Sequence, residues 1–414
     1  MARFSPLSSR HAQAEASIAR YGSGGDGSPD GVELVATFGD LNLEYASLRK
    51  HCVIFDQPHR GVLELEGADR LEFLNRMVTQ ELRNLPPFSA RHSFWLNRKG
   101  RIDADLRIID LPERTLIDVD IHAAARAAET LASFIVTEDA TLRDISEKTH
   151  RLALHGPTAI DLVHNLAAPA EGSDASGPAF GELEPRRACV VKLAGHSVVI
   201  DRDDSAGEIG LELTMSVDAA RDVYDYLLTR ASLPDEPGGG HREPNTANAL
   251  ANRIRLRESG WHAYNMARIE AGTAIYYLDF GPDSLPAESG VMEDRVSLKK
   301  GCYLGQEIVA RMHARGHPKQ VLVALKPAGR ADQGTPQPAT GGQIFAQPDS
   351  EEAVGAVTSS TLAIMLGAIP VCFAQVKWEH REPGTTLFVE AEGTRLEMTV
   401  QPQLRFWPRP PDSR

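Results

Sequence analysis

The sequence predicts an α+β fold that ends in a small all-β domain. Strand-like and helix-like segments are mixed up to residue 317 without the regular alternation of a doubly wound parallel sheet. Short strand-like runs follow at 353–358, 371–378 and 386–399, separated by glycine and proline, as is typical of a small barrel. The 42% hydrophobic and 24% charged residues are the balance of a folded globular chain.

The predicted elements can be placed in order along the chain. A short helix is expected over 8–20, and 22–30 forms a flexible break. Residues 61–66 alternate as a strand does, and Asp69 can begin a helix that the proline pair 86–87 ends. Further strands are expected near 151–155, 188–201 and 208–214, and further helices at 122–135 and 216–230. The stretches 231–247 and 327–343 have loop composition.

One predicted strand, 102–109, has a charged face. Its apolar residues share one side, and Asp103, Asp105 and Arg107 share the other, because side chains in a strand repeat every two residues. Two carboxylates beside an arginine can hold a cationic or amidine-like ligand and exchange protons. An ordinary solvated face is the alternative that the pattern alone leaves open.

Charge and cysteine content exclude several classes of protein. The chain has 414 residues and a net charge of −13, which argues against broad nucleic-acid binding. It lacks an apolar stretch of the roughly 20 residues that a membrane span needs, as well as the apolar core of an export signal, so we expect a cytoplasmic location without membrane association. The four cysteines are far apart and form no CxxC pair, which suits a reducing compartment.

The segment around Cys302 reverses the sign of the chain's charge. Residues 295–319 contain six lysines or arginines and one acid, Glu307. Gly305 precedes a predicted helix over 306–314, so Cys302 lies close to a helix start. Nearby cations and a helix N-terminus both favour the thiolate over the thiol. The alternative is a small residue in a tight turn whose charged neighbours are merely solvated.

This segment also resembles a known family. Residues 299–307 read K-K-G-C-Y-L-G-Q-E and resemble the K-G-C-Y-x-G-Q-E motif of the YgfZ family of folate-binding proteins. That family belongs to the superfamily of the glycine-cleavage T-protein, an aminomethyltransferase. Similar segments cover most of the chain, from about residue 38 to about residue 389: 55–61, 206–212, 268–272, 286–288 and 354–359.

The resemblance implies the aminomethyltransferase-like folate-binding fold, which has two interlocked α+β lobes and a C-terminal β-barrel around a central cavity. We expect the folate-binding core over 1–317 and the barrel over 318–403. Within the core, one lobe would combine 1–50 with 145–250, and the other 51–144 with 251–317.

The same resemblance implies which residues bind tetrahydrofolate or a one-carbon derivative. Asp105 falls on the carboxylate that faces the pterin and the one-carbon unit. Glu212 falls on a carboxylate that binds the pterin ring, where it can accept two hydrogen bonds from the 2-amino and N3–H edge. Arg268 is expected to pair with the folate glutamate. An internal ion pair of Arg268 with Glu270 or Asp279 is the alternative.

The sequence departs from the T-protein pattern within this pocket. Ala104 replaces the first aspartate of a pair, and Asp120 stands where the T-protein has a folate-contacting asparagine. An aspartate can accept a bond from the pterin but cannot donate one as an amide does. These changes weaken the case for aminomethyl transfer more than the case for folate binding.

Within the motif, Cys302 is expected to be a nucleophile or transient ligand, with Lys300 holding an anionic group. The other motif residues are Gly301, Tyr303, Gly305, Gln306 and Glu307. The two glycines would let the backbone approach the site, and the Gln–Glu pair would orient the ligand or pin the loop.

Three functions follow as hypotheses. The first is a tetrahydrofolate-binding YgfZ-type protein that assists assembly or repair of iron–sulfur enzymes, and thereby indirectly supports tRNA modification. Its partners would be folate and iron–sulfur client enzymes or assembly factors. The second is a folate-dependent aminomethyltransferase or demethylase with Asp105 as the key carboxylate. The third, a cluster scaffold, requires the scattered cysteines to converge or two chains to share a cluster, so we assign no metal ligands.

Overall fold

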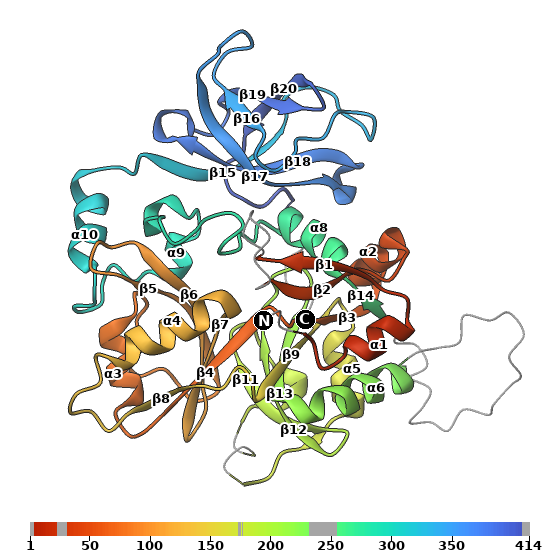
Figure 1. The fold of residues 1–414 in the computed structure, drawn as a ribbon, viewed down its shortest axis with the longest axis vertical. Coiled ribbons are helices and arrows are strands. Elements are labelled where there is room, and N and C mark those ends of the chain that lie inside the picture. The colour runs from red at the N-terminus through yellow and green to blue at the C-terminus, as the bar shows by residue number, and fades with distance from the viewer. Residues whose placement is uncertain (1–3, 23–30, 173–174, 176, 232–254, 408–414) are drawn as a thin grey trace, which may run out of the picture.

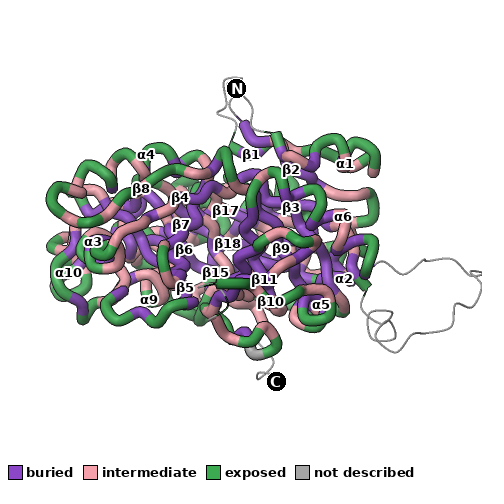
Figure 2. Tube along the Cα trace, turned by 90° about the horizontal axis from the view of Figure 1, so that it is seen from below, coloured by how far each residue is buried: buried purple, intermediate pink, exposed green. Residues whose placement is uncertain are grey.

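Two β-sheets stand side by side and a closed barrel lies above them in the computed structural model (Figure 1). The structure describes residues 4–22, 31–172, 175, 177–231 and 255–407. Helices cover the outer faces of the lobes, and buried residues gather along the strands between them (Figure 2). This arrangement confirms the predicted α+β class and the C-terminal barrel. Within the described ranges, no helix is both long and apolar enough to cross a membrane.

The five-stranded sheet forms one lobe and is antiparallel throughout, in the order β5-β6-β7-β4-β8. Helices α3 (Arg70–Met77) and α4 (Ile121–Ala132) contribute apolar residues to its core. The apolar face predicted for 102–109 is fully buried there, which confirms that the strand's periodicity was interpreted correctly. The strands are β4 (Arg60–Glu66), β5 (Ser89–Leu96), β6 (Ile102–Asp110), β7 (Arg114–Asp120) and β8 (Thr141–Asp144).

The seven-stranded sheet forms the second lobe, in the order β10-β11-β12-β13-β9-β3-β14. Its last pair, β14 and β3, is parallel, whereas its other neighbours are antiparallel. The strands are β3 (Cys52–Asp56), β9 (Thr149–His155), β10 (Ala168–Pro169), β11 (Ala188–Leu193), β12 (His196–Arg202), β13 (Gly210–Ser216) and β14 (Leu256–Ser259). The helices of this side of the molecule are α2 (Leu41–Lys50), α5 (Ala159–Leu166), α6 (Ala220–Ala231) and α8 (Trp261–Ala271).

The two lobes are interlocked because the chain passes between them twice. It leaves the seven-stranded sheet after β3, enters the five-stranded sheet at β4 through residues 57–59, and returns at β9. The predicted lobe ranges placed 52–56 and 256–259 with the five-stranded lobe. β3 pairs with β9, and β14 pairs with β3, so both segments belong to the seven-stranded sheet. The sequence did not indicate the second pairing, because the two strands of a parallel pair are distant in sequence.

The C-terminal barrel closes in the order β15-β18-β17-β16-β19-β20. It is entered from α9 (Met292–Arg295) and α10 (Gln306–Arg315), which lie at the outer edge of the five-stranded lobe (Figure 1). Alternate residues of its strands fill a separate apolar core. The strands are β15 (Gln320–Pro327), β16 (Gln343–Phe345), β17 (Ala353–Ala363), β18 (Ile369–Lys377), β19 (Thr386–Ala391) and β20 (Thr394–Val400).

Two predicted helices are shorter in the structure because tertiary contacts end them. The helix expected over 8–20 is α1 (Ser8–Gln13), and β1 (Ser17–Tyr21) follows it and pairs with β2 (Val32–Thr37). The helix expected to reach the prolines at 86–87 ends at Met77, where its terminal carbonyls bind a lysine from a distant segment. Of the predicted loops at 22–30 and 231–247, only the first residue of each is described: Gly22, and Ala231, which is the last residue of α6. The rest of both loops lies outside the described residues.

Candidate functional site

A cavity of about 700 Å³, including space open to solvent, lies where the two sheets face each other. Its walls are polar and carry both signs of charge, with two tyrosines among them. Its lining includes Gln57, His59, Asp105, Asp118, Glu212 and Arg295.

Two of the predicted folate residues line this cavity from different sheets. Asp105 projects from β6 of the five-stranded sheet, and Glu212 projects from β13 of the seven-stranded sheet. Each carboxylate has one arginine partner. Arg295 Nε lies 3.4 Å from Asp105 Oδ1, and Arg151 Nη2 donates to Glu212 Oε2 at 3.2 Å. The structure therefore brings the two predicted carboxylates to one site, and each shares its arginine with a second acid, Asp294 for Arg295 and Asp118 for Arg151.

A buried ion network supports these two pairs. Arg151 Nη1 lies 2.7 Å from Asp118 Oδ1, and Arg60 Nη2 lies 2.7 Å from Asp118 Oδ2. Burial alone would raise the pKa of Asp118, but Arg151 and Arg60 outweigh it and lower the pKa to about 2. Arg107 contacts Asp201 and, at 2.8 Å, Asp203. Acidic and basic side chains alternate across the network. Each charged side chain is therefore held in place by a partner of opposite charge.

Two uncharged groups of the cavity have unused hydrogen-bonding atoms. Gln57 Oε1 and His59 Nδ1 are buried and have no partner among the described residues. Burial, together with the charge of Arg60, lowers the pKa of His59 to about 3, so its imidazole is neutral at physiological pH.

The Cys302 turn lies outside this cavity. Cys302 and Gly301 are exposed, while Tyr303 joins the apolar core of the five-stranded lobe. Gly305 has a φ of +80°, and a Cβ there would lie 2.9 Å from the carbonyl oxygen of Asn97, so only glycine fits. The turn is thus built onto the β5–β6 hairpin and holds its cysteine toward solvent.

Lys300 does not hold an anion in this turn. Its ammonium donates to the carbonyl oxygens of Asn75 at 2.6 Å, Val78 at 2.7 Å and Gln80 at 2.8 Å. These bonds use all three of its donors, and the side chain is buried. Burial lowers the pKa of Lys300 to about 8, which still leaves it charged at pH 7. The predicted anion-holding role is therefore replaced by a structural one at the end of α3.

The other motif residues divide between the loop and the helix. Gln306 Nε2 donates to the carbonyl oxygens of Gly301 at 3.3 Å and Lys300 at 3.5 Å, which pins the loop. Glu307 is exposed on the first turn of α10. The predicted cluster of six basic residues is also smaller than expected around Cys302, because Arg295 turns into the cavity and Lys300 into the core.

Asp120 is not placed to contact a ligand in the cavity. Its carboxylate accepts a hydrogen bond from the Tyr21 hydroxyl and another from the His122 amide at 2.9 Å, which caps α4. It is buried at the end of β7 and is not part of the cavity wall. Asp120 was predicted to contact folate, but it does not line the cavity. Asp118, two residues earlier on the same face of the strand, lines it instead.

Arg268 also lies outside the cavity wall. It forms the internal ion pair with Asp279 that was the alternative to a folate contact. Arg268 Nη1 lies 2.5 Å from Asp279 Oδ2, and Nη2 donates to Ser359 Oγ of the barrel at 2.6 Å. The guanidinium is 1% exposed. It joins α8 to β17 and so supports the contact between the lobe and the barrel. Arg268 is therefore not assigned to the folate site.

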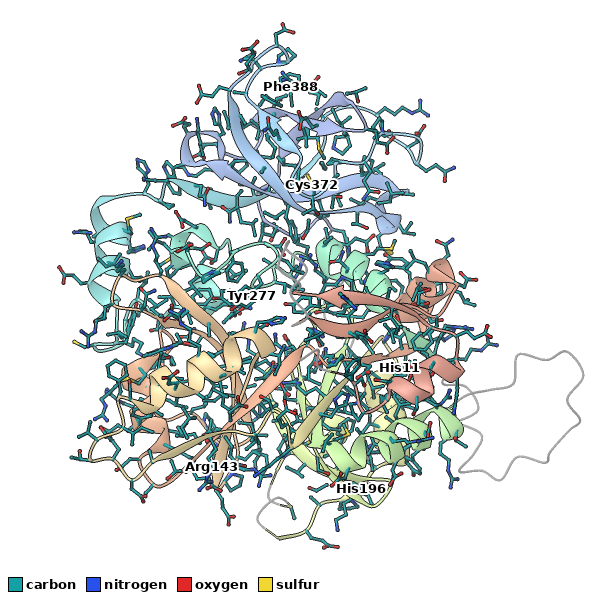
Figure 3. The ribbon with its side chains drawn as sticks, viewed as in Figure 1. His11, Arg143, His196, Tyr277, Cys372 and Phe388 are labelled. Carbon is teal, nitrogen blue, oxygen red and sulfur yellow. The ribbon has the colours of Figure 1, made fainter. Side chains whose placement is uncertain are left out.

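The four cysteines do not converge. Cys52 and Cys189 belong to the core of the seven-stranded lobe, and Cys372 lies inside the barrel (Figure 3). Burial raises the pKa of Cys189 to about 12 and raises the pKa values of the other two as well. Only Cys302 is exposed. A four-cysteine cluster site within one chain is therefore incompatible with this arrangement.

Comparison with known protein families identifies the fold. Residues 29–235 match the GCVT N-terminal domain, and residues 321–406 match the glycine cleavage T-protein C-terminal barrel domain. The first match alone spans half of the chain.

The chain belongs to the glycine-cleavage T-protein superfamily.

Individual members of the superfamily are similar along nearly their whole length. An aminomethyltransferase of Synechococcus sp. (strain CC9902) is 29% identical over 388 residues, which cover 92% of this chain and 94% of that protein. An aminomethyltransferase of Cutibacterium acnes is 28% identical, covering 88% and 90%. The crystal structure of the glycine cleavage system aminomethyltransferase T from Bartonella henselae shares the fold, with a TM-score of 0.75, 22% identity and 96% coverage of both chains.

The T-protein resemblance pointed to Asp105 and Glu212 but missed their partners. Arg295 appeared in the sequence only as one of the basic residues near Cys302, and Arg151 lies in a strand whose pairing could not be inferred. Gln57 stood within a segment similar to the superfamily's F-D-x-S-x-x-G, at a position that the motif leaves unspecified. A signal was present for Asp118, because it shares a strand face with Asp120.

Proposed function

We propose that this protein is a tetrahydrofolate-binding protein of the YgfZ type that supports iron–sulfur enzymes, and through them tRNA modification. The observation that carries the proposal is the Cys302 turn. Its lysine, tyrosine and second glycine are all committed to building a loop that exposes one cysteine, while the other three cysteines are buried. A purely structural turn has no need to present a thiol to solvent. Iron–sulfur clients or assembly factors are the proposed partners of that thiol.

Folate is proposed to occupy the cavity between the sheets. Members of the superfamily bind tetrahydrofolate, and the residues present fit it. Glu212 and Asp105 line the cavity and can accept bonds from pterin N–H groups. Bound folate would supply a carrier for a one-carbon unit, while the chain's own residues bind and orient it and hold compensating charge.

Aminomethyl transfer is the second candidate function. The position of Asp105 in the cavity wall favours it, as do relatives named aminomethyltransferase. Two contacts weaken it. Arg295 Nε lies 3.4 Å from Asp105 Oδ1 and occupies that oxygen, and Asp120 is committed to Tyr21 and to capping α4.

Replacing Cys302 by serine is expected to abolish rescue of iron–sulfur enzymes in cells that lack the protein. The exposed side chain has little packing to lose, so thermal melting and folate affinity should stay near wild type. The measurement combines complementation with melting of the purified variant. Cys372→Ser is the matched control. Cys372 is buried, so replacing its thiol by a hydroxyl should lower the melting temperature instead. Full rescue by folded Cys302→Ser would remove the thiol from the proposal.

Isolated protein is expected to show no useful release of ammonia and methylenetetrahydrofolate from an aminomethyl-lipoyl carrier. The paired state of Asp105 is the physical reason. A coupled assay of both products, run beside a T-protein as positive control, measures this directly. Turnover on the order of 1–10³ per second, as is ordinary for enzymes, would promote the aminomethyltransferase function over the one proposed.

A further inference from the structure

A small apolar pocket lies between α10 and the short helix η4 (Pro286–Glu288), at the outer edge of the five-stranded lobe (Figure 1). It encloses about 210 Å³, including space open to solvent, and shares no lining residue with the cavity between the sheets. Its accessible wall is formed by four half-exposed side chains: Leu285, Met292, Ile308 and Met312.

The lining of this pocket favours a protein side chain as its occupant. It contains no charged and no aromatic residue. A nucleobase would need an aromatic side chain on which to stack, whereas an aliphatic side chain needs only apolar contact. Two of the four accessible residues are methionines, whose flexible side chains adapt to the shape of a partner.

Cations surround the pocket. Arg311 is exposed on α10 beside Met312. Two more lie close to Glu288 of η4: burial raises the pKa of this carboxyl, and the hydrogen bond from the Leu285 amide and the charges of Arg101 and Lys319 oppose that rise. Arg101 and Lys319 are therefore near the η4 wall of the pocket.

The hairpin between β5 and β6 brings two further cations to the same helix. A Cβ on Gly100 would lie 2.7 Å from Ile308 Cβ, so the hairpin touches the α10 wall of the pocket. Its tip carries Arg98 and Lys99, both exposed. None of these five cations forms an ion pair with a described residue. The exposed acids of the same segments are fewer: Asp283, Glu293 and Glu307. The local excess of positive charge stands out in a chain of net charge −13.

We propose that this α10 face, meaning the pocket with its five surrounding cations, docks an acidic segment of a partner protein that inserts one aliphatic side chain into the pocket. Complementary charge speeds the encounter and orients the partner, and the apolar anchor holds it. The inference rests on the proposed role of the Cys302 turn and names the chemistry of its partner. Cys302 lies four residues before α10, so a segment seated on this face is held close to the thiol.

Disulfide trapping at Cys302 tests the docking with defined peptides. Each peptide has an N-terminal cysteine, a flexible four-residue spacer and a five-residue probe: acidic with a central leucine, acidic with a central serine, or basic with a central leucine. Each is supplied as its disulfide with mercaptoethanol. The Cys302 thiolate attacks the peptide sulfur and releases mercaptoethanol, and added mercaptoethanol lets the bound peptides exchange to equilibrium. Cys302 is the one exposed cysteine of the four, so mass spectrometry of the adducts reports on this site.

The acidic leucine peptide should exceed each of the other two about tenfold on the wild-type protein at low salt. Its advantage over the basic peptide should fade at 0.5 M salt. Met312→Gln should reduce the preference for leucine over serine, and Arg311→Glu with Lys319→Glu should remove the preference for acidic over basic. Met365→Gln and Lys148→Glu are the matched controls, because both side chains are exposed elsewhere and should change neither ratio.

Equal shares of the three peptides on wild type would overturn the inference. A preference for acidic peptides without one for leucine would overturn it too. Binding of a uridine oligomer that the charge reversals abolish and Met312→Gln does not would assign the face to nucleic acid instead. If trapping shows no preference while Cys302→Ser still abolishes rescue, the docking inference fails and the proposed function stands. If the peptide preferences hold and Cys302→Ser rescues fully, the α10 face remains a docking surface and the proposed function fails.

Discussion

Lys300→Met is expected to destabilise the protein by about 3 kcal/mol or more, since three buried carbonyl oxygens at the end of α3 would lose their donor. Each unsatisfied buried acceptor costs roughly 1–3 kcal/mol, and partial access of water reduces the sum. Methionine keeps the apolar stem, so lost packing is a minor term. The positive charge also lies favourably at a helix C-terminus, which the variant gives up.

Thermal melting measures this loss. A change of 3 kcal/mol corresponds to a melting temperature lower by about 3–4 °C in a chain of this size. Lys299→Met is the control, because the neighbouring side chain is exposed and its loss should change stability by only about 0.5 kcal/mol. A Lys300→Met protein that melts like wild type but fails to support iron–sulfur enzymes would return Lys300 to the role of anion holder.

Arg268→Met is expected to cost about 3–5 kcal/mol, because it leaves Asp279 as a buried charge without its cation. Asp279 Oδ1 would still accept from Ser359 Oγ at 2.6 Å, and Oδ2 from the Ile275 amide at 2.9 Å, which softens the loss. The same guanidinium ties the barrel to the lobe through Ser359, so the barrel contact should loosen as well.

Thermal melting and folate titration together decide the role of Arg268. We expect a lower melting temperature and near-unchanged folate affinity, because the side chain is not part of the cavity wall. The double variant Arg268→Met with Asp279→Asn removes the uncompensated charge and should recover part of the stability. A single variant that melts normally yet binds folate at least tenfold more weakly would restore the folate contact that the resemblance implied.

Local periodicity predicted the elements whose stability is largely local. The alternation over 102–109 placed the apolar face of β6 in the core and Asp105 on the opposite face, and the glycine before 306 predicted α10. The barrel was predictable from short strands between glycines and prolines. In these elements, side-chain period and turn chemistry agree with the tertiary structure.

Contacts between distant segments were not predictable. Lys300 binds carbonyl oxygens 220 to 225 residues away in the sequence, and the motif around it gives no sign of these contacts. Arg295 and Arg268 stood in basic or superfamily-like segments, yet their partners come from other elements. The helix expected over 8–20 failed for the same reason, because pairing with β2 overrides the local preference of 17–21.

Titration of the protein with tetrahydrofolate by calorimetry, under anaerobic conditions, tests the folate cavity most directly. Wild type should bind. Glu212→Gln keeps size but removes the charge, and it should weaken binding about ten- to a hundredfold, because charge-assisted bonds are worth roughly 1.5–3 kcal/mol. Glu208→Gln is the matched control, since Glu208 pairs with Arg49 outside the cavity wall and its loss should leave affinity unchanged. Absence of binding by wild type, or equal affinity of Glu212→Gln, would contradict a folate site between the two sheets.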